Sequence, residues 1–69
     1  TNKMKNTLKV QRAILDLTQD DLAKEIGVSR QTINSIEKNR YVPSTVLALK
    51  LSAVFKINVN EFFTLEEDD

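Results

Sequence analysis

The sequence predicts a small all-α domain, and three local patterns indicate this fold class. Apolar residues recur at helical spacing, as in Leu22, Ala23 and Ile26. Residues with cap-forming side chains stand where such stretches begin. The only glycine, Gly27, and the only proline, Pro43, separate the stretches from one another. Together these patterns predict short helices joined by short loops.

Five helical segments are expected. The first covers about residues 6–15, with Leu8, Arg12 and Leu15 on one side. The second begins at Thr18, whose hydroxyl can form a capping box with Asp21. It ends at Gly27, because glycine tolerates the positive φ that often closes a helix.

The remaining three helices have similar boundary signals. The third is capped by Ser29 and ends near Lys38. The fourth opens at Pro43 and Ser44 and reaches about Phe55. Residues 58–61, with sequence NVNE, place an asparagine cap three residues before a glutamate, which predicts a short fifth helix.

Length and composition exclude several classes of protein. A chain of 69 residues forms at most one domain. It contains no cysteine and no histidine, so disulfides, thiolate metal sites and histidine catalysis are excluded. Neither an enzyme nor a cofactor is therefore expected. Long apolar runs and a secretory signal pattern are not visible, so we expect a cytoplasmic protein that does not contact membranes.

The charge is unevenly placed although the total is zero. Residues 1–60 carry ten basic and five acidic residues, while residues 61–69 carry five acidic residues and no basic one. A basic body with an acidic end is common among nucleic-acid-binding proteins. The alternative for the acidic end is that it only aids solubility.

Residues 19–38 have the spacing of a helix-turn-helix. Leu22, Ala23 and Ile26 precede Gly27, and further apolar residues follow at Val28, Ile33 and Ile36. Two short helices that cross steeply need a small residue at their contact, a flexible turn and apolar groups that seal the junction. The stretch supplies all three.

The segment LTQDDLAKEIGVSRQTINSIEKNRYVPS resembles the lambda-repressor-like, XRE-type family of transcriptional regulators. The resemblance extends over nearly the whole chain. It implies a five-helix domain that binds operator DNA as a homodimer, with a possible two-stranded sheet from residues 3–7 and 62–66. We therefore assign residues 4–65 to one DNA-binding domain and 66–69 to an acidic tail.

The third helix carries the expected base-reading residues. A helix in the major groove reads bases with exposed polar side chains near its N-terminal end. Arginine suits guanine, while glutamine or asparagine can pair with adenine through a donor and an acceptor together. Four residues share one face and match the family's recognition positions: Arg30, Gln31, Asn34 and Ser35. The alternative is an ordinary solvated helix face.

Phosphate contacts are expected around that helix. The resemblance implies that the side chain of Gln19 holds the DNA backbone, and a helix N-terminus offers further N–H donors. Tyr41 has an alternative role, packing on Pro43. The other expected phosphate-binding residues are Ser29, Thr32, Lys38, Asn39 and Arg40.

The resemblance also implies an internal ion pair between Arg12 and Glu37, which would orient the third helix. The chain departs from the family pattern elsewhere. Gln11 and Thr45 stand where large apolar residues are usual, and residues 14–15 are apolar where the family tends to be polar.

The fourth helix has more apolar residues than one buried stripe requires. Leu47, Ala48, Leu51 and Phe55 suit the core, and a second line is formed by Val46, Leu49 and Ala53. One interpretation is a fully buried helix. The other is a homodimer interface involving the C-terminal helices, as the resemblance implies.

These observations predict a sequence-specific transcriptional regulator, a repressor that occupies an inverted-repeat operator. No small-molecule effector is expected. The alternative is a protein-interaction module that keeps the fold without specific DNA binding, and acidic or apolar residues at positions 30, 31 and 34 would mark it. An antitoxin that represses its own operon is a special case of the first interpretation.

Overall fold

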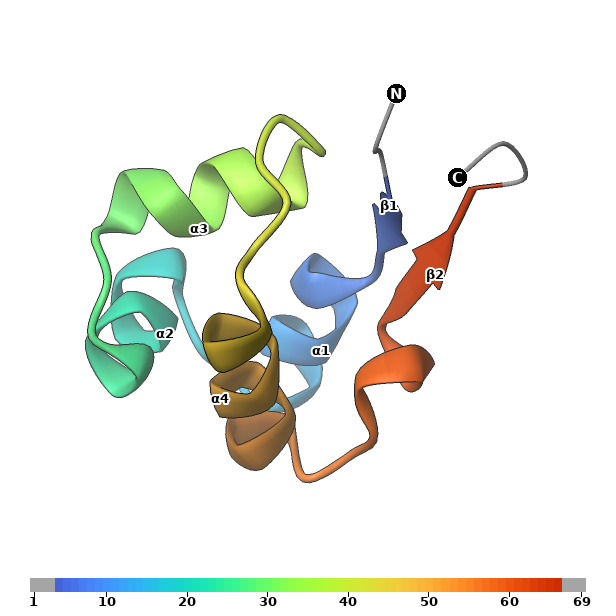
Figure 1. The fold of residues 1–69 in the computed structure, drawn as a ribbon. Helices are drawn as coiled ribbons and strands as arrows, with labels where there is room; N and C mark the ends of the chain where they lie inside the picture. Colours follow the sequence, from blue (N-terminus) through green and yellow to red (C-terminus); the bar gives the residue numbers. More distant parts are fainter. Residues whose placement is uncertain (1–3, 67–69) are drawn as a thin grey trace.

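The computed structural model describes residues 4–66 and confirms the predicted fold class (Figure 1). Four α-helices surround one core, and two short strands pair beside it. The helices are α1 (Leu8–Ile14), α2 (Gln19–Ile26), α3 (Arg30–Glu37) and α4 (Thr45–Phe55). The strands are β1 (Met4–Asn6) and β2 (Phe63–Leu65). Within residues 4–66, no helix has the length and apolar character needed to cross a membrane.

The two strands confirm the expected terminal sheet. They run antiparallel, with Met4 opposite Leu65 and Asn6 opposite Phe63. The Thr7 N–H extends the pairing by donating to the Phe62 carbonyl at 3.0 Å. Figure 1 shows the sheet at the opposite side of the molecule from the turn between α2 and α3. Lys3, which the sequence-based expectation includes in the strand, and residues 67–69 of the expected tail lie outside the described residues.

Each α-helix is followed by a residue with positive φ. These residues are Asp16, Gly27, Asn39 and Lys56, with φ between 57° and 74°. Gly27 occupies this conformation as predicted, and Asn39 does so because asparagine tolerates it best after glycine. Lys56 is the unexpected member, since a long side chain there is strained.

The core lies between the four helices and the sheet. Its centre is formed by side chains that are at most 2% exposed: Leu8, Leu22, Ile26, Ile33, Ile36, Leu51 and Phe62. The rings of Phe55 and Phe62 meet edge to face with centroids 5.1 Å apart. This contact joins α4 to the chain that enters β2.

Two segments differ from the sequence-based expectation. The first helix starts at Leu8 instead of residue 6, because Asn6 belongs to β1. The expected fifth helix is a single 3₁₀ turn, Val59–Glu61. Its capping box between Asn58 and Glu61 is present, but Phe62 and Phe63 turn into the core and end it.

The end of the first helix also differs from the sequence-based expectation. Leu15, expected beside Leu8 and Arg12, is 44% exposed, because it follows the last helical residue. Ile14 is exposed as well.

Candidate nucleic-acid interface

The two helices of the motif are held by the local signals that the sequence contains. Thr18 and Asp21 form the predicted capping box, with the Asp21 N–H donating to the Thr18 hydroxyl at 2.9 Å. Thr18 N–H donates back to the Asp21 carboxylate, which lowers the pKa of that carboxyl group. At the turn, Gly27 has a φ of 74° and the Val28 N–H donates to the Ala23 carbonyl. The start of α3 is capped by Ser29, whose hydroxyl accepts from the Thr32 N–H.

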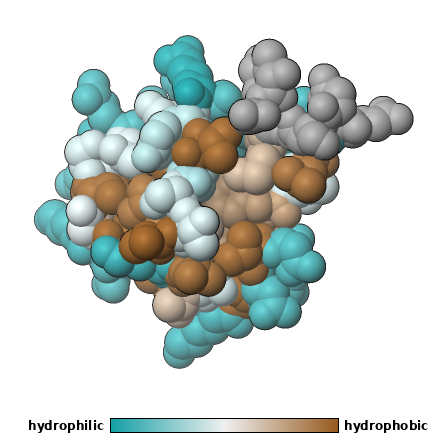
Figure 2. All heavy atoms as spheres, viewed as in Figure 1, coloured by the Kyte–Doolittle hydropathy of each residue, from teal (hydrophilic) through white to brown (hydrophobic). Residues whose placement is uncertain are grey.

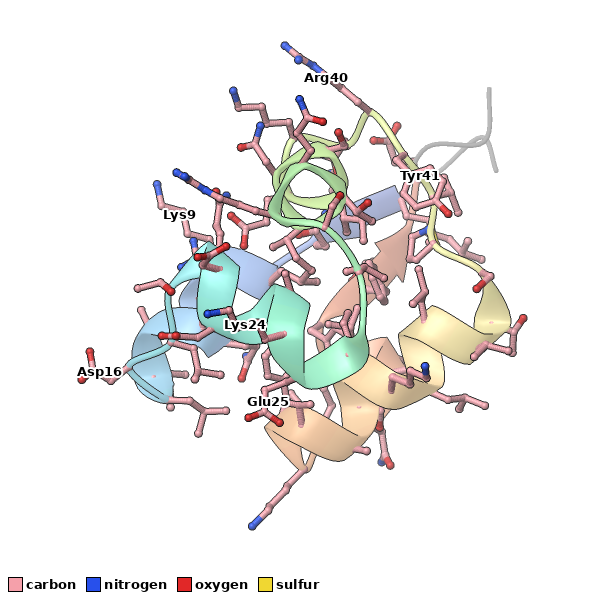
Figure 3. The ribbon with its side chains drawn as sticks, turned by 90° about the vertical axis from the view of Figure 1, so that its left-hand side faces the viewer. Lys9, Asp16, Lys24, Glu25, Arg40 and Tyr41 are labelled. Carbon is pink, nitrogen blue, oxygen red and sulfur yellow. The ribbon has the colours of Figure 1, made fainter. Side chains whose placement is uncertain are left out.

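Helix α3 has one apolar and one polar face. Ile33 and Ile36 are completely or almost completely buried against α2 and the core. Arg30, Gln31 and Lys38 are exposed, and the intervening polar residues are half-buried. Figure 3 looks along α3 and shows Arg40, just beyond its end, pointing away from the body of the protein.

An open hollow lies beside the polar face of α3. All of its lining residues belong to the set predicted to contact DNA: Ser29, Gln31, Thr32, Asn34, Ser35, Arg40 and Tyr41. A smaller hollow on the other side of Asn34 is lined by Gln19, Arg30, Gln31 and Asn34. The structure therefore brings the predicted base-reading residues together along the polar face of α3, between two hollows whose linings include most of the predicted phosphate-binding residues.

The ion pair expected between Arg12 and Glu37 is present in the structure. Arg12 Nε lies 2.6 Å from Glu37 Oε2, and Arg12 Nη2 lies 3.1 Å from Oε1. The two side chains are only 14% and 8% exposed. Arg12 Nη1 also donates to the Leu17 carbonyl, so the guanidinium joins α1, the next loop and α3. The hydrogen bond to Glu37 raises the pKa of Arg12.

Gln19 connects this ion pair to the polar face of α3. Its side-chain Nε2 donates to Glu37 Oε1 at 3.1 Å and to Asn34 Oδ1 at 3.3 Å. Both N–H bonds of the Gln19 amide are thus directed into the protein. The family resemblance predicts that this side chain holds a phosphate, whereas in the structure it braces Asn34.

Asn6 supports the opposite end of α3, a role that the sequence did not predict. Its Nδ2 donates to the Ile36 carbonyl and to Asn39 Oδ1, both at 2.8 Å. Its Oδ1 accepts from the Leu8 N–H at 3.2 Å. One side chain therefore joins β1, the start of α1 and the end of α3. No local pattern could identify it, because its partners on α3 and beyond are 30 and 33 residues away.

The charge on this side of the molecule is positive. Residues 29–41 contain three basic residues, Arg30, Lys38 and Arg40, and a single acidic one, Glu37, which is paired with Arg12. Lys9, which was not among the predicted site residues, projects from α1 at the level of α3 in Figure 3. Residues 4–66 hold no cluster of three side chains suited to bind a metal ion.

Comparison with known proteins finds related sequences. A helix-turn-helix family model matches residues 8–62. An uncharacterised HTH-type transcriptional regulator of Methanocaldococcus jannaschii is 52% identical over 66 residues, which span 96% of this chain and all of the relative.

Solved structures share the fold as well. A putative DNA-binding protein from Bacteroides fragilis superimposes with a TM-score of 0.78 at 26% identity, over 88% of this chain and 98% of that one. An SOS-response transcriptional repressor from Eubacterium rectale gives a TM-score of 0.73 at 35% identity, over 78% of this chain and 57% of that one.

Proposed function

The chain belongs to the XRE-like helix-turn-helix family of DNA-binding transcriptional regulators, and on this premise we propose that it is a repressor that reads an inverted-repeat operator through α3. The observation that carries the proposal is the polar face of α3 with the two hollows beside it, which are lined by residues suited to base edges and phosphates. Its relatives are HTH-type transcriptional regulators, a class without enzymatic activity.

Base reading is assigned to the face of α3 that the two hollows share. The side chains of Arg30 and Gln31 are exposed and make no hydrogen bond within the described part of the chain, so they are available for a ligand. A guanidinium can bind both acceptors of guanine at once, and an amide can bind adenine. Asn34 and Ser35 line the same surface one turn further along α3.

Phosphate binding is assigned to the rim of this surface. Ser29 and Thr32 lie at the N-terminus of α3, where backbone N–H groups favour an anion. Lys38, Asn39, Arg40 and Tyr41 follow the other end of the helix. We assign Gln19 to this set through its backbone N–H at the first turn of α2, because its side-chain N–H groups are already used. Lys9 is added for its position in Figure 3.

A homodimer is proposed because α4 has an exposed apolar face. Val46 and Leu49 are 61% and 59% exposed although both belong to a helix that also contributes Leu51 to the core. Val42 before α4 and Leu65 in β2 are exposed too. Figure 2 shows apolar residues gathered over this side of the molecule, across α4 and toward β2.

A second copy of the chain is the proposed occupant of that face. One recognition helix of eight residues reaches few bases, so two copies related by a two-fold axis are needed to read a longer operator. Burial of the apolar side chains would provide the association energy.

Repression and a cytoplasmic location complete the proposal. Occupying an operator is the simplest regulatory act for a domain this small, and the similar protein from Eubacterium rectale is a transcriptional repressor. Such a protein acts where bacterial and archaeal DNA lies, in the cytoplasm. It is proposed to need neither a cofactor nor an effector. An antitoxin role would use the same DNA-binding surface.

The decisive experiment is selection of bound duplexes from a random DNA pool at moderate salt. We expect an inverted repeat with half-sites about one helical turn apart. Arg30→Ala should relax the preference at one base pair per half-site, at a cost of about 1–3 kcal/mol. Lys38→Ala should instead weaken all sequences about equally and reduce the salt dependence.

A different result would support the alternative function. If no sequence is enriched and binding disappears as salt is raised, only backbone electrostatics is present. The protein would then be an interaction module with the fold of a regulator. In the binding measurements, Lys24→Ala is the matched control for Lys38→Ala, because it removes one positive charge from α2.

A further inference from the structure

We propose that Asn34 reads its base only as a hydrogen-bond donor, because side chains from three helices fix the direction of its amide. This inference rests on the proposed placement of α3 in the major groove. It departs from the expectation that an asparagine pairs with adenine through a donor and an acceptor together. Gln19, Glu37 and Arg12 act as positioning residues for Asn34.

The orientation is set first at Glu37. A glutamate carboxylate that pairs with an arginine can only accept hydrogen bonds. Glu37 Oε1 accepts from Arg12 Nη2 and from Gln19 Nε2, each at 3.1 Å. If the Gln19 amide were turned over, its carbonyl oxygen would face the carboxylate as a second acceptor. The Gln19 group that faces Glu37 must therefore be the NH₂ group.

The orientation of the Gln19 amide in turn fixes the orientation of the Asn34 amide. The second N–H of Gln19 Nε2 points at Asn34, and the atom that receives it must be an acceptor. Asn34 Oδ1 occupies this place at 3.3 Å. The other end of the Asn34 amide, its Nδ2, makes no hydrogen bond within residues 4–66, and Asn34 lines both hollows beside α3. Nδ2 is thus the group left to meet a ligand.

This arrangement decides which bases fit. Bidentate pairing with adenine requires both ends of an amide to face the same base edge. Asn34 would have to turn away from Gln19 to do so. With Nδ2 alone, it can donate to the N7 or O6 atoms of guanine, the N7 atom of adenine or the O4 atom of thymine. On the strand that Asn34 faces, cytosine offers only its N4 amino donor, and the acceptors of its partner guanine lie across the groove, so cytosine at this position is disfavoured.

The experiment starts from the duplex obtained by random-pool selection with the wild-type protein. Asn34→Ala locates the base pair concerned, because preference there should vanish. Each of the four bases is then placed at that position, and binding is measured by titration. We expect the wild type to bind cytosine about tenfold more weakly than the best acceptor base.

Reversal of the hydrogen-bond polarity provides the sharpest test. In Asn34→Asp, one carboxylate oxygen can still accept from Gln19, and the other presents an acceptor to the base. The ranking should invert, with cytosine or adenine preferred through their amino groups. An unchanged ranking would overturn the inference. Replacement of adenine by purine removes the 6-amino group. If this replacement abolishes the wild-type preference, the inference is overturned as well.

The positioning role of Gln19 is tested separately. Gln19→Met keeps the length of the side chain but cannot brace Asn34, so discrimination against cytosine should fall to about twofold or less. A merely structural role would weaken all duplexes alike and leave the ranking intact. Gln11→Met is the matched control on α1 and should retain the wild-type ranking, with thermal melting used to confirm that both variants fold.

The outcomes separate this inference from the proposed function. If the wild type selects no sequence, the proposed function fails and the inference falls with it. If a sequence is selected but Asn34→Ala relaxes no base pair, the regulator function stands and the inference alone is wrong.

Discussion

Helices α3 and α4 are both partly exposed, but they divide their residues in opposite ways. In α3 the apolar residues Ile33 and Ile36 are buried and the outward face is polar. In α4 the residues Leu51 and Phe55 are buried, yet the outward face carries Val46 and Leu49. Helix α3 is therefore suited to a polar ligand, and helix α4 to an apolar surface.

The two helices also differ in how they are supported. Polar contacts from other segments hold α3: Glu37 is paired with Arg12, and the Ile36 carbonyl accepts from Asn6. The position of α4 depends mainly on packing, through residues such as Phe55 and its ring contact with Phe62. Hydrogen bonds fix directions, whereas apolar packing tolerates small shifts. The directional support thus belongs to α3, the helix proposed to read bases.

The largest expected effect comes from breaking the polar support of α3. Glu37→Ala leaves the largely buried guanidinium of Arg12 without its carboxylate, which should cost about 3 kcal/mol of unfolding free energy. Chemical denaturation measures the loss. Glu25→Ala removes a glutamate from α2 on the side away from α3 (Figure 3) and should change stability by less than about 0.5 kcal/mol. Equal stabilities for the two variants would contradict the role of the ion pair.

The next effect concerns the apolar face of α4. Leu49→Glu places a charge in the proposed dimer interface and should weaken association by about 2 kcal/mol or more, while the fold of each protomer persists. Sedimentation equilibrium measures the dissociation constant. Ile14→Glu is the matched control, because Ile14 is 68% exposed on α1. If both variants remain dimeric, or if the wild type is monomeric, the assigned interface is wrong.

A smaller effect is expected at the ends of α2 and α4. Both helices end in a left-handed residue, Gly27 in one case and Lys56 in the other. Lys56→Gly should therefore raise the free energy of unfolding and Gly27→Ala should lower it, each by about 1 kcal/mol. A methyl group at Gly27 would meet no atom within 4 Å, so strain alone is tested. Melting temperatures that move in the same direction for the two variants would refute this account.

The smallest effect is a pH dependence at the start of α2. The pKa of Asp21 is lowered by the hydrogen bond from Thr18, so the carboxylate favours the folded state above the pKa it has in the unfolded chain. That contribution is lost as the pH falls through the lower, folded-state pKa. We expect wild-type stability to decrease more than that of Asp21→Asn between about pH 5 and pH 2. Parallel acid unfolding curves for the wild type and Asp21→Asn would contradict this role of the Asp21 carboxylate.

The helix-turn-helix could be predicted from sequence because its signals are local. Thr18, Gly27 and Ser29 mark helix ends within a few residues of their partners, and the apolar spacing defines the buried face. The sheet and the Arg12–Glu37 pair were expected only from the resemblance to a family. Their residues are distant in the sequence, and no periodicity connects them.

Other features depend on contacts that local patterns do not encode. The NVNE sequence has a helix cap, but the helix stops after one turn because Phe62 and Phe63 enter the core. Gln19 and Asn34 are both recognisable as polar surface residues. The direction of each amide follows from the ion pair between Arg12 on α1 and Glu37 on α3, and no local sequence pattern places that pair beside them.

The sheet has a consequence for the order of events on the ribosome. Asn6 is made early and holds the end of α3, but the strand that contains it pairs with β2, at Phe63–Leu65, near the other end of the chain. Such distant contacts form late in folding. The helix-turn-helix can therefore assemble on the nascent chain while the end of α3 still lacks its tether. The Asn6 tether at the end of α3 is therefore secured only after Leu65 has left the ribosome, later than the contacts that Arg12 and Gln19 make with α3.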